Sequence, residues 1–380
     1  MTEKKQGPKV DKPPGSVARS IGSILSAALL LVAARGFGGA EGSSTHQHQG
    51  GFDETTSASP KRSAQEPGRG RDAASPQHLP VKGWWDVLYR VYEEIGRDRI
   101  LAVAAGVTFY VLLAIFPAIG AFVSLYGLVA DPSTIGEHLA DLGGILPGGA
   151  VEIIGEQVKS ITSNDETALG FTFFSGLAIS LWSANAGMKA VFDALNIAYE
   201  EHEKRNFVWL NVWSLTFTVG MIAFLAVALS AVVVVPAFLA AVGLGTATEW
   251  LIWIGRWPVL LAVTLGALAL LYRYGPSRDR AQWRWLAPGA VTAAVGWLIA
   301  SMFFSWYAAN FGSYNKTYGS LGAVIGFMTW IWLSVTIVLV GAELNAEAEH
   351  QTAEDTTEGA PQPMGVRGAR VADAVGQTRD

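Results

Sequence analysis

The chain has 380 residues, of which 51% are hydrophobic and only 16% are charged, and its net charge is −5. A soluble domain carries about a quarter of its residues as charged side chains, so the composition argues against a purely soluble fold. The absence of cysteine excludes disulfides, thiolate nucleophiles and cysteine-ligated metals. No dense stripe of Lys and Arg with interleaved aromatic residues occurs, so we expect no nucleic-acid partner.

The two ends of the chain differ in composition from its centre. Residues 1–80 and 351–380 are rich in Gly, Pro, Ser, Gln and charge, and we expect both to be disordered tails. Within the first, 20–34 is a run of fifteen uncharged residues that reaches about 22 Å as a helix, which is short for a bilayer core. A helix on the membrane surface is the preferred interpretation; a true span and a processed signal peptide are the alternatives.

The centre of the chain, 82–350, predicts an all-α membrane protein with a bundle of six transmembrane helices. A bilayer core needs about 20 apolar residues at helical rise, and six runs meet or approach this requirement. These predicted spans are 101–130, 169–188, 207–235, 258–272, 285–307 and 320–342.

The distribution of Lys and Arg predicts the orientation of the bundle. If 82–100 lies inside, the three inside segments hold eleven Lys and Arg, and the three outside segments hold three. Positive residues are enriched on the cytoplasmic side, so we expect both termini to be cytoplasmic. Trp residues cluster near the span ends, as expected for aromatic belts at the membrane surface.

Three segments of the predicted bundle resemble one known family. They are AAGVTFYVLLAIFPAI (104–119), LWSANAGMKAVFDALNIAYEEHEKRNF (181–207) and YNKTYGSLGAVIGFMTWIWLSVTIVLVGAELN (314–345). Their order and placement are similar to the YihY/virulence factor BrkB family of inner-membrane proteins. The resemblance implies a six-helix protein of the inner membrane with cytoplasmic ends. Members have been linked to serum resistance and to lipid movement across the envelope, and an older ribonuclease BN label is regarded as an error.

No catalytic constellation is visible in the sequence. All six histidines lie in tails or loops, and none forms a helical metal-binding pair. Nucleotide-binding loops and nucleophile elbows are also missing. We therefore expect no enzyme activity, no catalytic residue, no metal and no cofactor.

Polar residues at membrane depth are informative, because each must be paired or hydrated there. In this sequence they form two stripes. Spacings of three, four and seven place each stripe on one helix face. The first stripe is Trp182, Asn185, Lys189 and Asn196, with Asp193 positioned to pair with Lys189; the second is Thr329, Thr336 and Glu343, with Asn345 just beyond.

The two stripes admit two interpretations. Facing each other, they would line a cavity or substrate path in which Lys189 or Glu343 contacts a head group. Alternatively, they are hydrogen-bonding contacts between helices, with Lys189 and Glu343 extending to the membrane surface. Gly322 and Gly326 form a Gly-x-x-x-Gly motif that indicates close helix packing.

Two functions remain open from the sequence. One is a transporter or passive path for lipid or another amphipathic molecule, with membrane lipids as partners. The other is a non-catalytic scaffold that recruits partners through its disordered tails. A membrane-bound nuclease is disfavoured.

Overall fold

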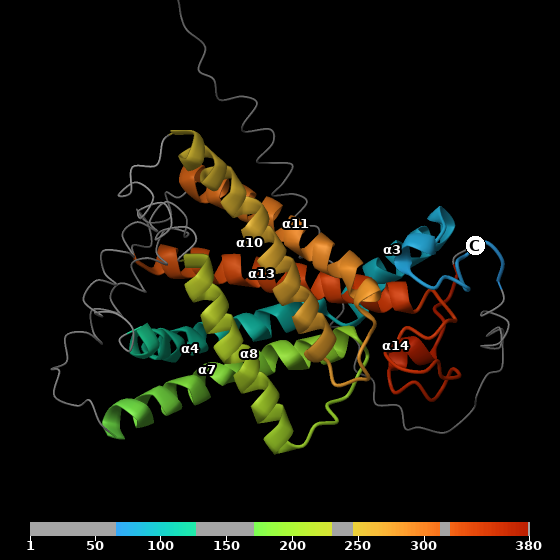
Figure 1. Ribbon diagram of the computed structural model, residues 1–380, viewed down its shortest axis with the longest axis horizontal. Helices are drawn as coiled ribbons and strands as arrows, with labels where there is room; N and C mark the ends of the chain where they lie inside the picture. The colour runs from blue at the N-terminus through green and yellow to red at the C-terminus, as the bar shows by residue number, and fades with distance from the viewer. Residues whose placement is uncertain (1–65, 127–170, 230–245, 312–319, 379–380) are drawn as a thin grey trace, which may run out of the picture. The chain divides into compact units, whose positions relative to one another are not determined.

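The computed structural model describes residues 66–126, 171–229, 246–311 and 320–378 (Figure 1). Within these ranges the chain is helical and has no strand beyond one isolated bridge between Ala281 and Thr357. The prediction of an all-α chain is confirmed. The elements are η1 (Pro76–His78), α3 (Val81–Arg97), α4 (Ile100–Tyr126), α7 (Phe171–Ala198), α8 (Phe207–Leu229), α10 (Thr246–Tyr274), α11 (Trp283–Phe311), α13 (Ser320–Glu349) and α14 (Arg370–Asp373).

Each of the six predicted spans overlaps one of the long helices α4, α7, α8, α10, α11 and α13 in its described residues. Within the described ranges, three segments are long and apolar enough to cross a membrane: Phe207–Leu225, Trp283–Tyr307 and Val324–Glu349. The pair Val81–Arg97 and Ile100–Ile115, bent by 60° at its break, adds a fourth if it is counted as one span. The total of six crossings stays a prediction, and segment 20–34 lies outside the described residues.

The surfaces of these helices are apolar where a soluble protein would be polar. Ile179, Leu225, Ile299 and Met302 come from three different helices, and all are exposed, Met302 by 74%. A helix in water turns its apolar stripe toward the core. Helices that are apolar on both faces are typical of segments surrounded by hydrocarbon.

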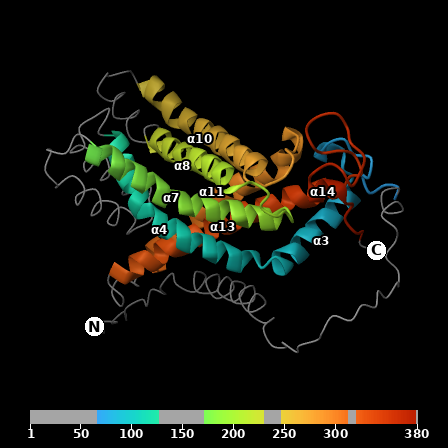
Figure 2. The ribbon, with the colours of Figure 1, turned by 90° about the horizontal axis from the view of Figure 1, so that it is seen from below.

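The helices pack in pairs that are then joined by α13. The close pairs are α4 with α7, α11 with α13, α10 with α11 and α8 with α7, and α13 also contacts α3, α4 and α7. Figures 1 and 2 both show α4 and α7 lying side by side. The buried core between the helices includes Ile100, Val107, Phe192, Leu195, Leu271, Leu286 and Leu339.

The tightest helix contact joins α11 and α13 at two glycines. The space that a Cβ on Gly289 would need is occupied by the carbonyl oxygen of Gly341, and the Asn345 Nδ2 atom lies 2.5 Å from that position. A Cβ on Gly341 would lie 2.5 Å from the Tyr272 hydroxyl, which donates to the Val338 carbonyl at 2.8 Å. Small residues thus let the two backbones touch. A Cβ on Gly326, by contrast, would meet no described atom within 4 Å, so the contact lies nearer the C-terminus of α13 than the Gly322–Gly326 motif.

The prediction that both tails are disordered is wrong in part, because residues 66–80 and 351–378 are ordered and pack together. Ala353 donates its N–H to the Arg71 carbonyl at 2.7 Å, and the Thr352 hydroxyl donates to the Ala73 carbonyl at 2.8 Å. Val371 and Ala372 of α14 are buried. Composition suggested disorder, but backbone groups of the two stretches satisfy each other across about 280 positions of sequence. Residues 1–65 lie outside the described residues.

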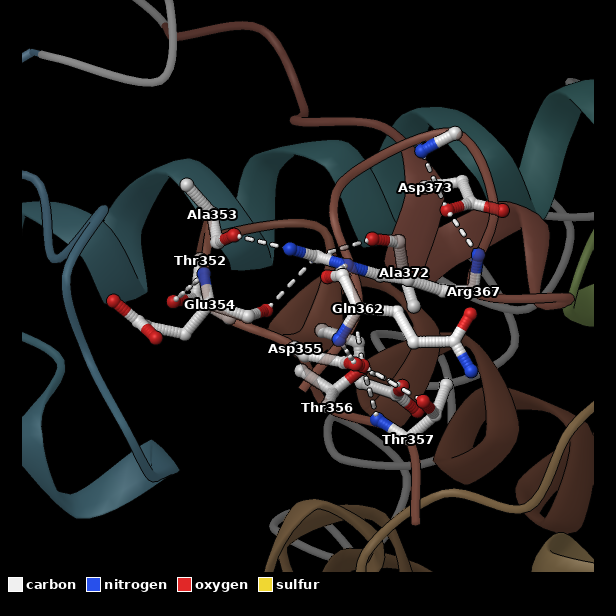
Figure 3. Close-up of polar contacts among 12 residues, drawn as sticks. Thr352, Ala353, Glu354, Asp355, Thr356, Thr357, Gln362, Arg367, Ala372 and Asp373 are labelled. Atoms are coloured by element: carbon white, nitrogen blue, oxygen red, sulfur yellow. Dashed lines mark hydrogen bonds and ion pairs between the residues drawn. The ribbon is translucent and has the colours of Figure 1, made fainter. Parts of the chain in front are cut away.

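Arg367 holds the C-terminal segment together (Figure 3). Its guanidinium donates to four carbonyl oxygens, those of Ala353 at 2.8 Å, Glu354 at 3.1 Å, Gln362 at 3.0 Å and Ala372 at 2.7 Å. Two carboxylates accept backbone N–H groups around it. Asp355 accepts from Thr357 and Gln362, and Asp373 accepts from Gly365 and Arg367.

We expect Gly289→Ala to destabilise the bundle by about 1–3 kcal/mol, because the added methyl group forces α11 and α13 apart. Gly296→Ala on the same helix is the control, since its Cβ would lie 3.4 Å from Ile337 in ordinary contact. Thermal unfolding in detergent measures both. Equal melting temperatures for the two variants would contradict the close approach.

We expect Arg367→Met to release the C-terminal segment, because each buried carbonyl left without a donor costs roughly 1–3 kcal/mol. Limited proteolysis should then cut within 351–378 much faster than in the unsubstituted chain. Arg284→Met is the control, because Arg284 is exposed and bonds the Gln282 side chain. Unchanged cleavage in the Arg367 variant would show that other contacts suffice.

Candidate functional site

The most concentrated polar region lies at one end of the helices, which we call the polar end. It comprises α3, the connections 199–206 and 275–282, the last turns of α13 and residues 350–378 (Figures 1 and 2). Glu343, Glu347 and Glu349 project from α13 into this region, and each is at most 3% exposed. Buried carboxylates require a charged or hydrogen-bonding partner, so the partners define the site.

Two of the three carboxylates form ion pairs with arginines. Arg278 donates from both terminal nitrogens to Glu349, at 3.1 and 2.7 Å. Burial alone would lower the pKa of Arg278, but the Glu349 charge outweighs it, so the pKa of the guanidinium is raised. Arg90 of α3 bonds Glu347 through its side chain and donates to the Glu347 carbonyl at 2.9 Å. These pairs tie α3 and the 275–282 connection to α13.

Glu343 differs from its two neighbours. Glu343 interacts electrostatically with Asp98, which lies in the break between α3 and α4. Its Oε1 atom is buried and has no partner among the described residues. No ion pair joins it to a described arginine or lysine, so Glu343 is the carboxyl group of this region with an unfilled bonding position.

Asn345 and Tyr199 add two more unfilled positions. Asn345 Oδ1 accepts the Gly289 N–H at 2.7 Å, whereas Asn345 Nδ2 is buried and has no described partner. The Tyr199 hydroxyl, just after α7, is buried and likewise without a described partner. Burial raises the pKa of Tyr199, so the hydroxyl keeps its proton as a potential donor.

The stripe on α7 faces α8 as well as the polar end. Asn185 bonds Asn211 at 3.4 Å and accepts from Thr218 at 3.3 Å, both on α8. Asn196 accepts the Ser277 N–H at 2.7 Å and donates to Glu203 at 3.1 Å, which positions the two connections. Both asparagines therefore act as contacts between elements.

Lys189 and Trp182 point toward the surface of α7. The Lys189 ammonium lies 5.2 Å from the centre of the Trp182 ring and 5.9 Å from that of Phe207. Trp182 is 53% exposed. The described contacts show no ion pair between Lys189 and Asp193, so aromatic faces take the place of the expected carboxylate.

The threonines of α13 bond their own helix. Thr329 donates to the Ile325 carbonyl and Thr336 to the Trp332 carbonyl, both at 2.8 Å. Of the second stripe, Glu343 and Asn345 thus reach the polar end, where Asn196 also lies. The described residues do not show the two stripes lining a shared path.

Helix α3 has an exposed apolar face that was not predicted from the sequence. Its charged face, with Asp86, Arg90 and Glu94, is buried against the protein, whereas its apolar face is exposed. That exposed face consists of Val81, Trp85, Leu88 and Tyr92. The spacing of four, three and four was visible in the sequence, but Trp85 was assigned only to an aromatic belt.

A cleft of 390 Å³ opens on this exposed face. Its lining combines cationic, acidic and aromatic side chains. The lining residues are Arg69, Lys82, Trp85, Asp86, Leu88, Tyr89 and Tyr92. Arg69 donates to both oxygens of Asp86, at 2.7 and 2.9 Å, which fixes the inner wall. The cleft therefore offers an ammonium group beside aromatic rings.

Acid should weaken the polar end through Glu203. Burial alone would raise the pKa of Glu203, but hydrogen bonds from Arg205 and Asn196 outweigh it and lower the pKa to about 2. A lowered pKa stabilises the fold above the unfolded value near 4.5, and this stability is lost as the pH falls toward 2. We expect the melting temperature of Glu203→Gln to fall less than that of the unsubstituted chain over this interval. Glu354→Gln, at an exposed position, is the control, and parallel curves for all three chains would contradict the prediction.

Comparison with known proteins places this chain among membrane proteins. The family model described as virulence factor BrkB matches residues 91–364. A Bacillus subtilis relative named putative ribonuclease-like protein YfkH is 31% identical over 64% of this chain and 88% of its own. UPF0761 membrane proteins of Mannheimia succiniciproducens and Pseudoalteromonas translucida are 24% and 26% identical, over 67% and 73% of this chain and 86% and 89% of theirs. No solved structure matches.

Proposed function

Since the chain belongs to the virulence factor BrkB family of membrane proteins, we propose that it provides a path by which lipid or another amphipathic molecule moves across the inner membrane. The observation that carries this proposal is the cleft on the outward face of α3. An amphipathic ligand needs a polar contact for its head group and an apolar surface for its chains. The cleft supplies both.

The orientation of α3 supports contact with lipid. Its polar face bonds the protein through Arg90 and Asp86, so the face that remains carries Trp85 at 69% exposure and Tyr92 at 62%. A helix whose apolar, aromatic face points away from its protein is suited to lie in the interfacial region of a bilayer. Trp and Tyr are favoured at that depth.

The charge of the cleft favours an anionic head group. Lys82 presents an ammonium group beside Trp85, while Arg69 is held by Asp86 on the inner wall. A basic side chain near the surface contributes about 1 kcal/mol to binding of anionic lipid. The excess of Lys and Arg in the connections of the polar end supports a cytoplasmic placement of this end, with both termini on that side.

No catalytic step is part of this proposal, and the scaffold alternative receives less support from the ordered residues. In the C-terminal segment, one of the two tails expected to recruit partners, residues 351–353 bond residues 69–73, and Gly376 bonds His350 and Arg71. These residues of the segment are therefore already engaged within the chain.

A liposome assay that follows fluorescent anionic phospholipid from one leaflet to the other tests the proposal. We expect liposomes with the unsubstituted protein to exchange lipid faster than empty liposomes. Lys82→Ala with Trp85→Ala should slow the exchange about fivefold, the effect of about 1 kcal/mol. Trp209→Ala is the matched control, since Trp209 is 58% exposed but does not line the cleft. Exchange equal to that of empty liposomes would refute the lipid path.

A further inference from the structure

Lys189 of α7 is a cation on the apolar outer surface of the helices. Its ammonium group lies 5.2 Å from the centre of the Trp182 ring and 5.9 Å from that of Phe207, the first residue of α8. Both rings are exposed, Trp182 by 53% and Phe207 by 70%. Among the described residues, no carboxylate and no hydrogen-bond acceptor engages this ammonium group. An ammonium group carries three hydrogen-bond donors, so these donors still need oxygen acceptors.

Lys189 lies at the boundary of the apolar surface. Phe207 begins Phe207–Leu225, a segment long and apolar enough to cross a membrane, so Lys189 is level with the start of that span. A charged side chain at this depth is costly unless it is paired. Asp193, one turn further along α7, is exposed, and the described contacts include no ion pair between it and Lys189. The acceptors that remain at this level are water and the head groups of the surrounding lipid.

An exposed stripe continues from Lys189 along α7, away from the polar end. Its members are Ala186, Trp182 and Ile179, which are spaced by three and four residues and therefore share one face. Ile179 is 67% exposed. The stretch of α7 from Lys189 to Ile179 spans about 15 Å, which is half of a bilayer core of about 30 Å. The cation and the apolar stripe together therefore match the depth of one leaflet.

The order of groups along this surface is that of a phospholipid. A phosphate group supplies oxygen acceptors for the ammonium donors, and an acyl chain covers the apolar stripe. A lipid with a net negative head group is favoured over a zwitterionic lipid, because the cation of a zwitterionic head group competes with Lys189 for the phosphate. We propose that Lys189 binds the phosphate of an anionic phospholipid in the leaflet at the polar end, and that an acyl chain of this lipid lies along Ala186, Trp182 and Ile179.

The two aromatic rings prepare Lys189 for this role. A lysine side chain on a bare surface samples many rotamers, and ordering it costs free energy when a ligand binds. The faces of Trp182 and Phe207 attract the ammonium group and hold it before the lipid arrives. The site shares no residue with the cleft on α3, and a lipid held at this position does not cross the membrane. The inference therefore does not rest on a lipid path.

Photo-crosslinking of the full-length protein in detergent micelles tests the proposal at the level of residues. The probes are phosphatidylglycerol, which is anionic, and phosphatidylcholine, which is zwitterionic, each with a diazirine in an acyl chain. We expect phosphatidylglycerol to label α7 around Trp182 and Ile179 more strongly than phosphatidylcholine does. Lys189→Gln should lower this labelling about fivefold, whereas Lys189→Arg should retain it. Equal labelling by the two lipids, or labelling that Lys189→Gln leaves unchanged, overturns the proposal.

Matched variants separate this site from general attraction of anionic lipid. Lys204→Gln removes an exposed lysine that bonds Glu201 at 2.8 Å, and the labelling of α7 should not change. Asp193→Asn should also leave it unchanged; a rise would show that Asp193 engages the ammonium group in the unsubstituted chain and would count against the site.

Gel filtration of the same samples tests a second copy of this chain as the occupant. A folded monomer that is labelled on α7 supports the lipid site. A dimer in which α7 is protected from both lipids assigns this surface to protein contact and overturns the proposal.

Discussion

Glu347 and Glu349 lie on the last turn of α13, where neither carboxylate reaches water. Charges in such a place must be paired, because an isolated buried charge costs several kcal/mol. This requirement fixes the position of Arg90 on α3 and of Arg278 in the 275–282 connection. The orientation of α3 follows from this pairing. Because its charged face must contact α13, its aromatic face is exposed on the surface of the protein. The cleft on α3 thus depends on the pairing of these carboxylates.

The positions of the long helices could be predicted from the sequence because an apolar run of sufficient length has few alternatives in a bilayer. The residues at which these helices end could not be predicted in the same way. The second span was expected to end at 188, before Lys189, and the sixth at 342, yet α7 continues past Lys189 to Ala198 and α13 past Glu343 to Glu349. Burial and pairing with distant arginines let charged residues remain helical. Order in 351–378 was missed for the same reason, since Arg71 and Gln351 are 280 positions apart and their contact leaves no local trace.

For the candidate site, periodicity identified the face of a helix but not the neighbour that it meets. Asn185 was placed correctly on a polar face of α7, but α8 supplies its partners. Glu343 and Asn345 were selected for their charge and amide groups, and the structure adds the information that each has a buried atom without a described partner. The α3 surface was overlooked because an amphipathic helix is usually assumed to turn its apolar side inward.

The bonds between residues 66–80 and 351–378 connect the stretch before the first long helix to the stretch after the last. The beginning of α3 and the end of α13 are thereby held together. Helices held together at one end can separate only at the other. Rocking motions of the bundle should therefore pivot about the clasped end, with the largest displacements at the opposite ends of the helices.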